Sequence, residues 1–189
     1  MPNGNAQRVV QVDVTCDAPG LESALRLFDE AEANPACRVV LVGLRTSSFD
    51  QSPIAQTLSS RFRNSGKVVI GTLSGQYGAD GVTLAAGADL VIGSDETELA
   101  LDVETVGFDA SWFPNLTLRD LKWLALCAGS LNAGQLAKSG FLNFVCPASD
   151  VRATAECVAQ DIARVPGDVL TLKKRAHDTR HRLATTTGR

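Results

Sequence analysis

The sequence lacks the cysteine and histidine patterns that mark metal centres and disulfide frameworks. Its five cysteines are an odd number, and no two of them form a C-x-x-C pair. We therefore expect small buried hydrophobic residues rather than ligands or bridges. The only two histidines, His177 and His181, lie four residues apart in the basic segment KKRAHDTRHR, which favours a solvated helix face over a metal site. The cysteines are Cys16, Cys37, Cys127, Cys146 and Cys157.

Long apolar runs and a strong charge of either sign are also missing. No run approaches the roughly 18 residues of a transmembrane span, and the first residues, MPNGNAQR, have no signal-peptide pattern. The net charge of -3 gives no general indication of nucleic-acid binding. We expect a cytoplasmic protein without membrane or nucleic-acid partners. With 189 residues, 44% of them hydrophobic, the chain is long enough for one domain with a real core.

The order of apolar and amphipathic segments predicts the fold class. Strand-like segments alternate with segments of helical periodicity, so we expect an α/β fold in a single domain over residues 1–189. A tail over about 184–189 is expected to be disordered. Strands are expected at 8–14, 37–44, 66–73, 89–94 and 98–103, with a last one at LNFV (142–145). Helices are expected at 21–33, from Pro53 toward Phe62, after Gly81, at 116–129, before Gly140, at 149–165 with Ser149 as cap, and from Gly167.

A glycine-rich turn follows the third predicted strand, in the segment SGQYGADGVTLAAGADLVIGS. Gly75, Gly78 and Gly81 recur every third residue. A dinucleotide fingerprint needs G-x-G-x-x-G, and a phosphate-binding P-loop needs Gly-Lys-Ser/Thr, so neither fits. An oxyanion hole at a helix N-terminus does fit, with a second N–H supplied by the loop SSFDQS. The alternative is that the glycines only allow the helix to pack on the sheet.

Several segments in order resemble the crotonase superfamily, also called the enoyl-CoA hydratase/isomerase family, from about Val9 to Ala176. CRVVLVGLRTSSFDQS is similar to the strand and first oxyanion loop of the family. GKVVIGTLSGQYGADGVTLAAGADLVIGSDETELALDVETVGF matches without a gap the run from KPVIAAVNG through a three-glycine turn to CDLVIA and FALPEVKLG. AGQLAKSGFLNFVCPASDV and LTLKKRAH are similar to the later segments AEEAYRLGLVNEVVP and LTKRAL.

The resemblance implies a crotonase-like ββα spiral, usually assembled as a trimer or a pair of trimers. It also implies an acyl thioester of coenzyme A or acyl-carrier protein as substrate, with no further cofactor and no metal. Two backbone N–H groups would stabilise the thioester enolate, and they fall at Gln51 and Asp80. Other positions that would line the substrate are Phe49, Tyr77, Gly78, Gly81, Thr83 and Val103.

The chain departs from the family where hydratases hold two glutamates. The gapless match places Thr83 and Val103 at those positions. Water addition needs one group to activate water and another to protonate the α-carbon, and neither residue can do this. We therefore expect something other than an ordinary hydratase. A slip of one residue would bring Asp102 or Glu104 into the second position.

Asp109, in VGFDASW, offers another carboxylate. Dihydroxynaphthoyl-CoA synthases have a similar VGSFD segment, and 4-chlorobenzoyl-CoA dehalogenases use an aspartate in this region. The alternative is that Asp109 caps the segment that follows it. Tyr77, the only tyrosine, could donate a hydrogen bond to the substrate or could simply pack in the core.

Two functions from different classes remain. The first is an enzyme that stabilises an enolate without the glutamate pair: a decarboxylase, dehydratase or isomerase of a specialised, polyketide-like pathway. Decarboxylation suits best, because loss of CO2 forms the enolate without a base. Decarboxylases of polyketide β-branching have a similar ADFVILS…YGF segment, and small partners from dihydroxyphenylacetyl-CoA biosynthesis have a similar WP. The second is a degenerate crotonase-fold subunit that binds a partner protein or a carrier domain.

Two further features bear on binding and assembly. The family's NRPxxxNAL loop, which helps hold coenzyme A, is shortened here to TCDAPGLESAL, so a reduced cover over the thioester is expected. The helices after Leu116 carry large apolar side chains, for which we expect burial in a homotrimer or hexamer. These are Trp112, Trp123, Leu124 and Leu126.

Overall fold

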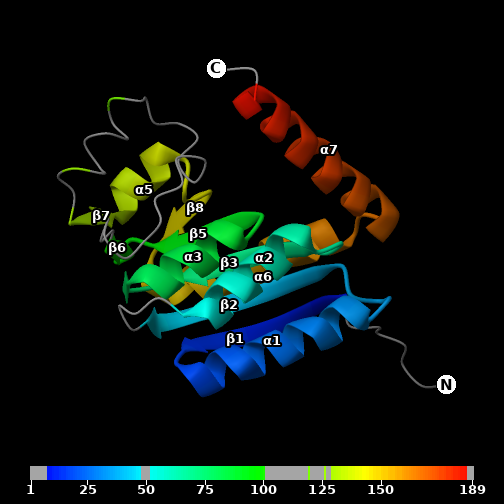
Figure 1. Cartoon of the computed structure of the whole chain (residues 1–189), viewed down its shortest axis with the longest axis horizontal. Helices are drawn as coiled ribbons and strands as arrows, with labels where there is room; N and C mark the ends of the chain where they lie inside the picture. The colour runs from blue at the N-terminus through cyan, green and yellow to red at the C-terminus, as the bar shows by residue number, and fades with distance from the viewer. Residues whose placement is uncertain (1–7, 48–51, 101–118, 120–125, 127–128, 187–189) are drawn as a thin grey trace.

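A parallel five-stranded sheet forms the centre of the protein (Figure 1). The computed structural model describes residues 8–47, 52–100, 119, 126 and 129–186. All neighbouring strands of this sheet are parallel, so their carboxyl ends share one edge. In spatial order the strands are β1 (Val9–Cys16), β2 (Val39–Ser47), β3 (Val68–Leu73), β5 (Leu90–Ser94) and β8 (Phe144–Cys146).

A second, small sheet adjoins the carboxyl edge. Its strands are β4 (Gln76–Tyr77), β6 (Glu98–Ala100) and β7 (Ser130–Asn132). β4 pairs parallel with β6, and β7 pairs antiparallel with it. Because β4 lies inside the glycine-rich turn, this sheet fixes the turn to the segment that follows β5.

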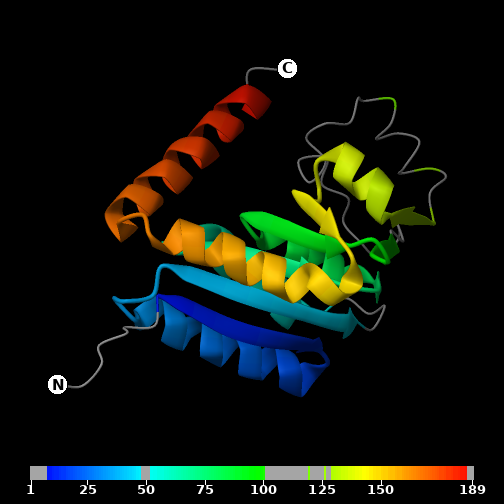
Figure 2. The same ribbon diagram turned by 180° about the vertical axis from the view of Figure 1, so that it is seen from behind.

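Helices cover both faces of the large sheet (Figures 1 and 2). Side chains of β2 alternate between two cores, as a strand buried on both faces requires. Val40 and Val42 pack with α1, α2 and α3, whereas Val39 and Leu41 pack against α6. The helices are α1 (Ala18–Ala33), α2 (Pro53–Asn64), α3 (Ala79–Gly87) and α6 (Val151–Ala163).

A last helix, α7 (Gly167–Thr186), runs away from the sheet after its first turns (Figure 1). Lys174 fastens it through three hydrogen bonds of its ammonium group. Nζ donates to Asp89 Oδ2 at 2.8 Å, to the Lys67 carbonyl at 3.0 Å and to the Phe62 carbonyl at 3.1 Å. The Lys174 side chain is only 8% exposed. A buried ammonium with three acceptors holds the start of the helix in place.

Most predicted elements are present, with differences at their ends. The helix beginning at Pro53 and the one beginning at Gly167 are confirmed, and Gly140 ends α5 (Ala133–Ser139) in the left-handed conformation. The prediction that Ser149 caps the next helix is wrong. A 3-10 turn over Ala148–Asp150 precedes α6, and the Ser149 hydroxyl donates to the Asp150 carboxylate instead.

Three other predicted segments lie partly or almost wholly outside the described residues. The strand expected at 98–103 is described only to Ala100, and the helix expected at 116–129 lies almost wholly outside the described residues. α7 continues to Thr186, past the start of the tail expected over about 184–189, and the last three positions are not described.

The four cysteines of the described residues are free thiols. The prediction that cysteines are buried is confirmed for Cys16 and Cys37, whereas Cys146 is half-buried. The prediction is wrong for Cys157, which is exposed on α6. Burial raises the pKa of Cys16 from 9.0 to about 12, and the nearby carboxylates of Asp80 and Asp17 contribute to the rise. Within the described residues, no group of His, Cys, Asp and Glu side chains is arranged to hold a metal ion.

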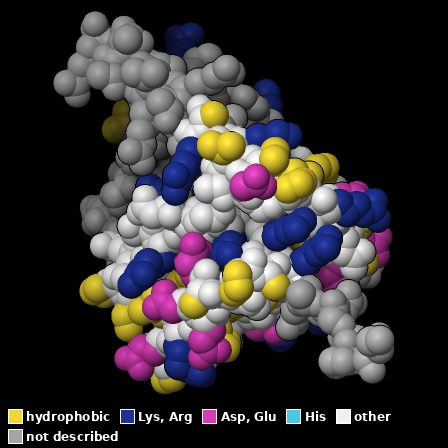
Figure 3. All heavy atoms as spheres, turned by 90° about the vertical axis from the view of Figure 1, so that its right-hand side faces the viewer, with side chains coloured by type: hydrophobic (Ala, Val, Ile, Leu, Met, Phe, Trp, Pro, Cys, Tyr) yellow, Lys and Arg dark blue, Asp and Glu magenta, His cyan; other side chains and the backbone are white. Residues whose placement is uncertain are grey.

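None of the described helices has the length and apolar character needed to cross a membrane. The face seen in Figure 3 carries Lys and Arg side chains among Asp and Glu side chains, with no region of one sign alone.

Close packing of α3 on α2 leads to a first prediction. A Cβ at Gly87 would lie 2.5 Å from Ser59 Oγ, 2.7 Å from its carbonyl oxygen and 2.9 Å from its Cα. The backbone of α2 cannot move aside easily, so Gly87→Ala should lower the free energy of unfolding by about 1–3 kcal/mol in urea titration. Gly129→Ala is the control, because no atom lies within 4 Å of a Cβ there. Equal stability of the two variants would contradict this packing.

Cysteine burial leads to a second prediction. The pKa of Cys16 is about 12 in the folded chain, whereas the thiol of the unfolded chain has the ordinary pKa of 9.0. The free energy of unfolding should therefore fall as pH rises through this window. Between about pH 8 and pH 10 the parent should lose more stability in urea titration than Cys16→Ala. A maleimide should label Cys157 in the native protein and Cys16 only after unfolding; rapid native labelling of Cys16 would contradict its burial.

Candidate active site

The glycine-rich turn lies where β3 ends at the carboxyl edge of the sheet. Gly75 has φ of 98°, in the left-handed region where glycine is strongly favoured. Its carbonyl accepts the Glu98 N–H at 3.0 Å, which starts the small sheet. Gly78 then adopts an extended conformation and serves as the N-cap of α3. Carboxyl ends of parallel strands are where ligands bind in open α/β sheets.

The first turn of α3 contains Asp80, whose N–H the sequence predicts as one of the two donors of an oxyanion hole. The first bond within the helix runs from the Val82 N–H to the Gly78 carbonyl, at 3.0 Å. The N–H groups of Asp80 and Gly81 come before it in the chain, so they have no acceptor inside the helix. Gly78 provides no side-chain cap. Both Asp80 and Gly81 are buried.

The start of α2 is bonded to this helix through the Asp80 side chain. Asp80 is 1% exposed, and its Oδ1 accepts the backbone N–H of Ser52 at 2.8 Å. Ser52 directly follows Gln51, which lies outside the described residues. The structure thus brings the neighbour of one predicted oxyanion residue to the other. The N–H of Gln51 itself stays a prediction.

The Asp80 carboxylate also sets the local electrostatics. Its charge is the second cause, after burial, of the raised pKa of Cys16, and Asp17 is the third. Asp80 stands in the first turn of α3, where the helix dipole favours negative charge. The edge therefore combines backbone donors with a buried carboxylate, and an anionic ligand would experience both.

The Tyr77 hydroxyl is hydrogen-bonded to backbone groups inside the fold. The side chain is 1% exposed, and its hydroxyl lies 2.7 Å from the Leu44 carbonyl and 3.1 Å from the Ser74 carbonyl. The same oxygen accepts the Ser74 N–H at 2.8 Å. Because a phenol has one hydrogen, its donor capacity is spent on a backbone carbonyl. Burial raises the pKa of Tyr77. This geometry favours packing over a substrate hydrogen bond.

Thr83 lies three residues after Asp80, on the same side of α3. It is 8% exposed, and its carbonyl accepts the hydroxyl of Ser59 on α2 at 2.7 Å. Its side chain is a hydroxyl, so no carboxylate stands at this position. The predicted residues Phe49, Val103 and Asp109 lie outside the described residues.

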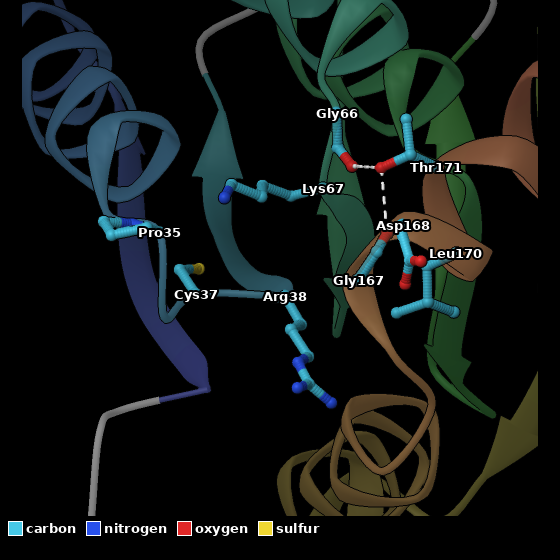
Figure 4. A pocket seen from close by; sticks show the side chains of 9 residues that line it. All are labelled: Pro35, Cys37, Arg38, Gly66, Lys67, Gly167, Asp168, Leu170 and Thr171. Atoms are coloured by element: carbon cyan, nitrogen blue, oxygen red, sulfur yellow. Dashed lines mark hydrogen bonds between the residues drawn. The ribbon is translucent and has the colours of Figure 1, made fainter. Parts of the chain in front are cut away.

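A pocket of about 330 Å³ lies at the opposite edge of the sheet, between the starts of β2, β3 and α7 (Figure 4). Its cations are engaged in holding backbone. Arg38 Nη1 donates to the carbonyls of Ala163 and Val165 at 2.9 and 2.8 Å, and Lys67 Nζ donates to the Asn34 carbonyl at 3.0 Å. We therefore place the candidate site at the glycine turn rather than here.

Sequence reasoning did not foresee the bond between Asp80 and Ser52. The available signal was an aspartate where the family resemblance has a small residue. The partner of that aspartate lies 28 residues away, and no local spacing rule points to it.

Comparisons with known proteins identify the family of the chain. Residues 44–189, well over half of the chain, match the sequence model of the family described as enoyl-CoA hydratase/isomerase. A search among curated proteins gave no match.

Solved structures share the fold at low sequence identity. A probable enoyl-CoA hydratase from Mycobacterium thermoresistibile has a TM-score of 0.81 and 18% identity, covering 97% of this chain and 87% of that one. A monofunctional enoyl-CoA isomerase from Mycobacterium smegmatis has a TM-score of 0.76 and 16% identity, covering 92% and 89%. A methylmalonyl-CoA decarboxylase has a TM-score of 0.74 and 12% identity, covering 93% and 78%.

These similarities confirm the single-domain crotonase-like fold expected from the resemblance. Together with the match over residues 44–189, they show that the chain belongs to the enoyl-CoA hydratase/isomerase family, the crotonase superfamily.

Proposed function

We propose that the protein is an enzyme that binds an acyl thioester at the glycine turn and stabilises its enolate with the backbone N–H groups of Asp80 and Gln51. The observation that carries this proposal is the 2.8 Å bond from the Ser52 N–H to Asp80, which holds the start of α2 against the start of α3. Two donors from separate segments, aimed at one oxygen, are what an oxyanion hole requires. Gly78 and Gly81 leave room for the thioester, which Phe49, Thr83 and Val103 would line.

Decarboxylation is the reaction that these residues support best. When a β-carboxylate leaves as CO2, the electron pair of the broken bond becomes the enolate, and no base is consumed. Thr83, where hydratases hold a glutamate, cannot act as a base at neutral pH. One structural neighbour is a methylmalonyl-CoA decarboxylase, whose name describes this type of reaction. A dehydratase or isomerase using Asp109 is the second option, in either case within a specialised, polyketide-like pathway.

A non-catalytic role is the alternative from another class. Asp80 adds a buried negative charge close to where an enolate would form, and Thr83 supplies no carboxylate for acid–base chemistry. Both features would suit a degenerate subunit that binds a partner protein or a carrier domain. The proposal covers thioesters of coenzyme A and of acyl-carrier protein.

A panel of thioesters distinguishes these functions. Malonyl-, methylmalonyl-, glutaconyl- and crotonyl-thioesters, on coenzyme A and on a carrier protein, would be incubated with the protein and followed by mass spectrometry. We expect loss of CO2 from a β- or vinylogous carboxylate and hydration of crotonyl-CoA near the background rate. Loss of acid–base catalysis costs on the order of 10²–10⁴ per group. Asp109→Asn should leave binding intact and slow turnover if Asp109 is the acid.

Two outcomes would count against the proposal. Robust hydration of crotonyl-CoA would show that a catalytic acid and base are present after all. Absence of binding and turnover across the whole panel would favour the non-catalytic subunit.

Assembly is a further part of the proposal. Four large apolar side chains of the described residues are exposed: Leu126 (82%), Leu172 (66%), Phe144 (47%) and Val145 (41%). Phe144 and Val145 lie on β8, an edge strand. Unpaired edges with apolar side chains are usually covered, so we propose a homotrimer or hexamer.

Light scattering tests this assembly. We expect a mass of three or six chains at micromolar concentration, and replacement of Phe144 and Val145 by Lys should reduce it. A 20.0 kDa particle from the parent chain would contradict the proposal.

A further inference from the structure

We infer that the Asp80 carboxylate is a positioning residue, which holds Ser52, the residue after the proposed donor Gln51, against the N-terminus of α3. The inference rests on the proposed function for its catalytic consequence. Its structural part, a bond between two segments 28 residues apart, stands on the geometry alone.

The need for such a bond arises at the start of α2. Ser52 is the N-cap, and its hydroxyl accepts the Ile54 N–H at 3.2 Å. Its own N–H points away from the helix and requires a separate acceptor. In a capping box, a Glu or Gln at the third helical position supplies it. Here that position is Ala55, which has no acceptor in its side chain.

Helix α5 of the same chain has a complete capping box formed by neighbouring residues. At the start of α5, Asn132 accepts the Gln135 N–H at 3.0 Å, and Gln135 Oε1 accepts the Asn132 N–H at 3.0 Å. For α2, Asp80 of α3 takes the place that Gln135 has in α5. The capping box of α2 is thus completed across space, by a residue of the other oxyanion segment.

This arrangement fixes Ser52, the residue that follows the proposed donor in the chain. Its N–H is held by Asp80 of α3 at 2.8 Å, and its hydroxyl accepts the Ile54 N–H of α2 at 3.2 Å. A peptide unit is planar, so the bond to the Ser52 N–H is made one peptide unit away from the proposed donor. A charge-assisted bond to a side chain 1% exposed makes this attachment strong.

The negative charge of Asp80 would also repel a negatively charged enolate, which works against the benefit of positioning. Its field already contributes to the raised pKa of Cys16. If repulsion outweighed positioning, a neutral acceptor at residue 80 would give a faster enzyme. Asparagine keeps a carbonyl oxygen that can accept the Ser52 N–H, so Asp80→Asn separates the charge from the bond.

Hydrogen exchange tests the bond without any assumption about activity. In the full chain, exchange of peptides covering 48–56 would be compared by mass spectrometry for the parent, Asp80→Ala and Asp80→Asn. We expect roughly tenfold faster exchange in Asp80→Ala and a return toward the parent in Asp80→Asn. Asp17→Ala is the control: its carboxylate caps α1 by accepting the Gly20 N–H, so exchange should rise in α1 instead. Asp80→Ser, too short to reach Ser52, replaces Asp80→Ala if the latter does not fold.

Kinetics with a thioester that the parent turns over test the catalytic consequence. We expect Asp80→Ala to lower kcat at least tenfold with a smaller change in KM, and Asp80→Asn to recover most of kcat. Unchanged exchange in Asp80→Ala would overturn the inference. Faster exchange with unchanged kcat, or Asp80→Asn faster than the parent, would overturn its catalytic part. If the parent binds no thioester, the proposed function is wrong, and so is the catalytic part of the inference. The exchange comparison still decides whether the bond between Asp80 and Ser52 exists.

Discussion

A buried N–H at the start of a helix must find an acceptor outside that helix, and this requirement organises the carboxyl edge of the sheet. Three helices begin there: α1 follows β1, α2 follows β2, and α3 follows β3 after the short strand β4. α1 is capped by Asp17, and α2 is capped by Ser52 with Asp80 as the distant partner. α3 begins at a glycine that has no side chain to offer. The helix without a side-chain cap is the one whose first N–H groups the proposed chemistry uses, because a cap there would compete with a ligand oxygen.

Features specified by neighbouring residues could be predicted from the sequence. Alternating apolar runs located the strands, and Pro53 and Gly140 marked a helix start and a helix end. The family resemblance fixed the topology that no periodicity could give. The prediction for the cap of α6 is wrong because a 3-10 turn over Ala148–Asp150 precedes the helix, so that Asp150 and not Ser149 stands at the N-cap, without a capping bond from its side chain.

The candidate site could be predicted only in part, for a physical reason. The position of the glycine turn follows from local spacing, but the role of a side chain depends on what the fold brings to it. Tyr77 reads as a possible donor in the sequence, and in the structure its hydroxyl hydrogen serves the backbone. The sequence predicts a role for the backbone N–H of Asp80 alone, and in the structure the carboxylate of this residue connects two segments. Family membership leaves the reaction open as well, since one fold supports several chemistries and the residues at the site decide among them.

The anchoring of α7 has a consequence for how the sequence can drift. Two of the three acceptors of Lys174 are main-chain carbonyls, those of Phe62 and Lys67. A carbonyl remains in place whatever side chain the residue carries, so substitutions at those two positions leave the acceptor present. Of the four residues that form the Lys174 contacts, substitution can therefore remove a bonding group only at Lys174 itself and at its acidic partner Asp89. Mutation at Phe62 or Lys67 changes a side chain and leaves the acceptor of this contact in the main chain.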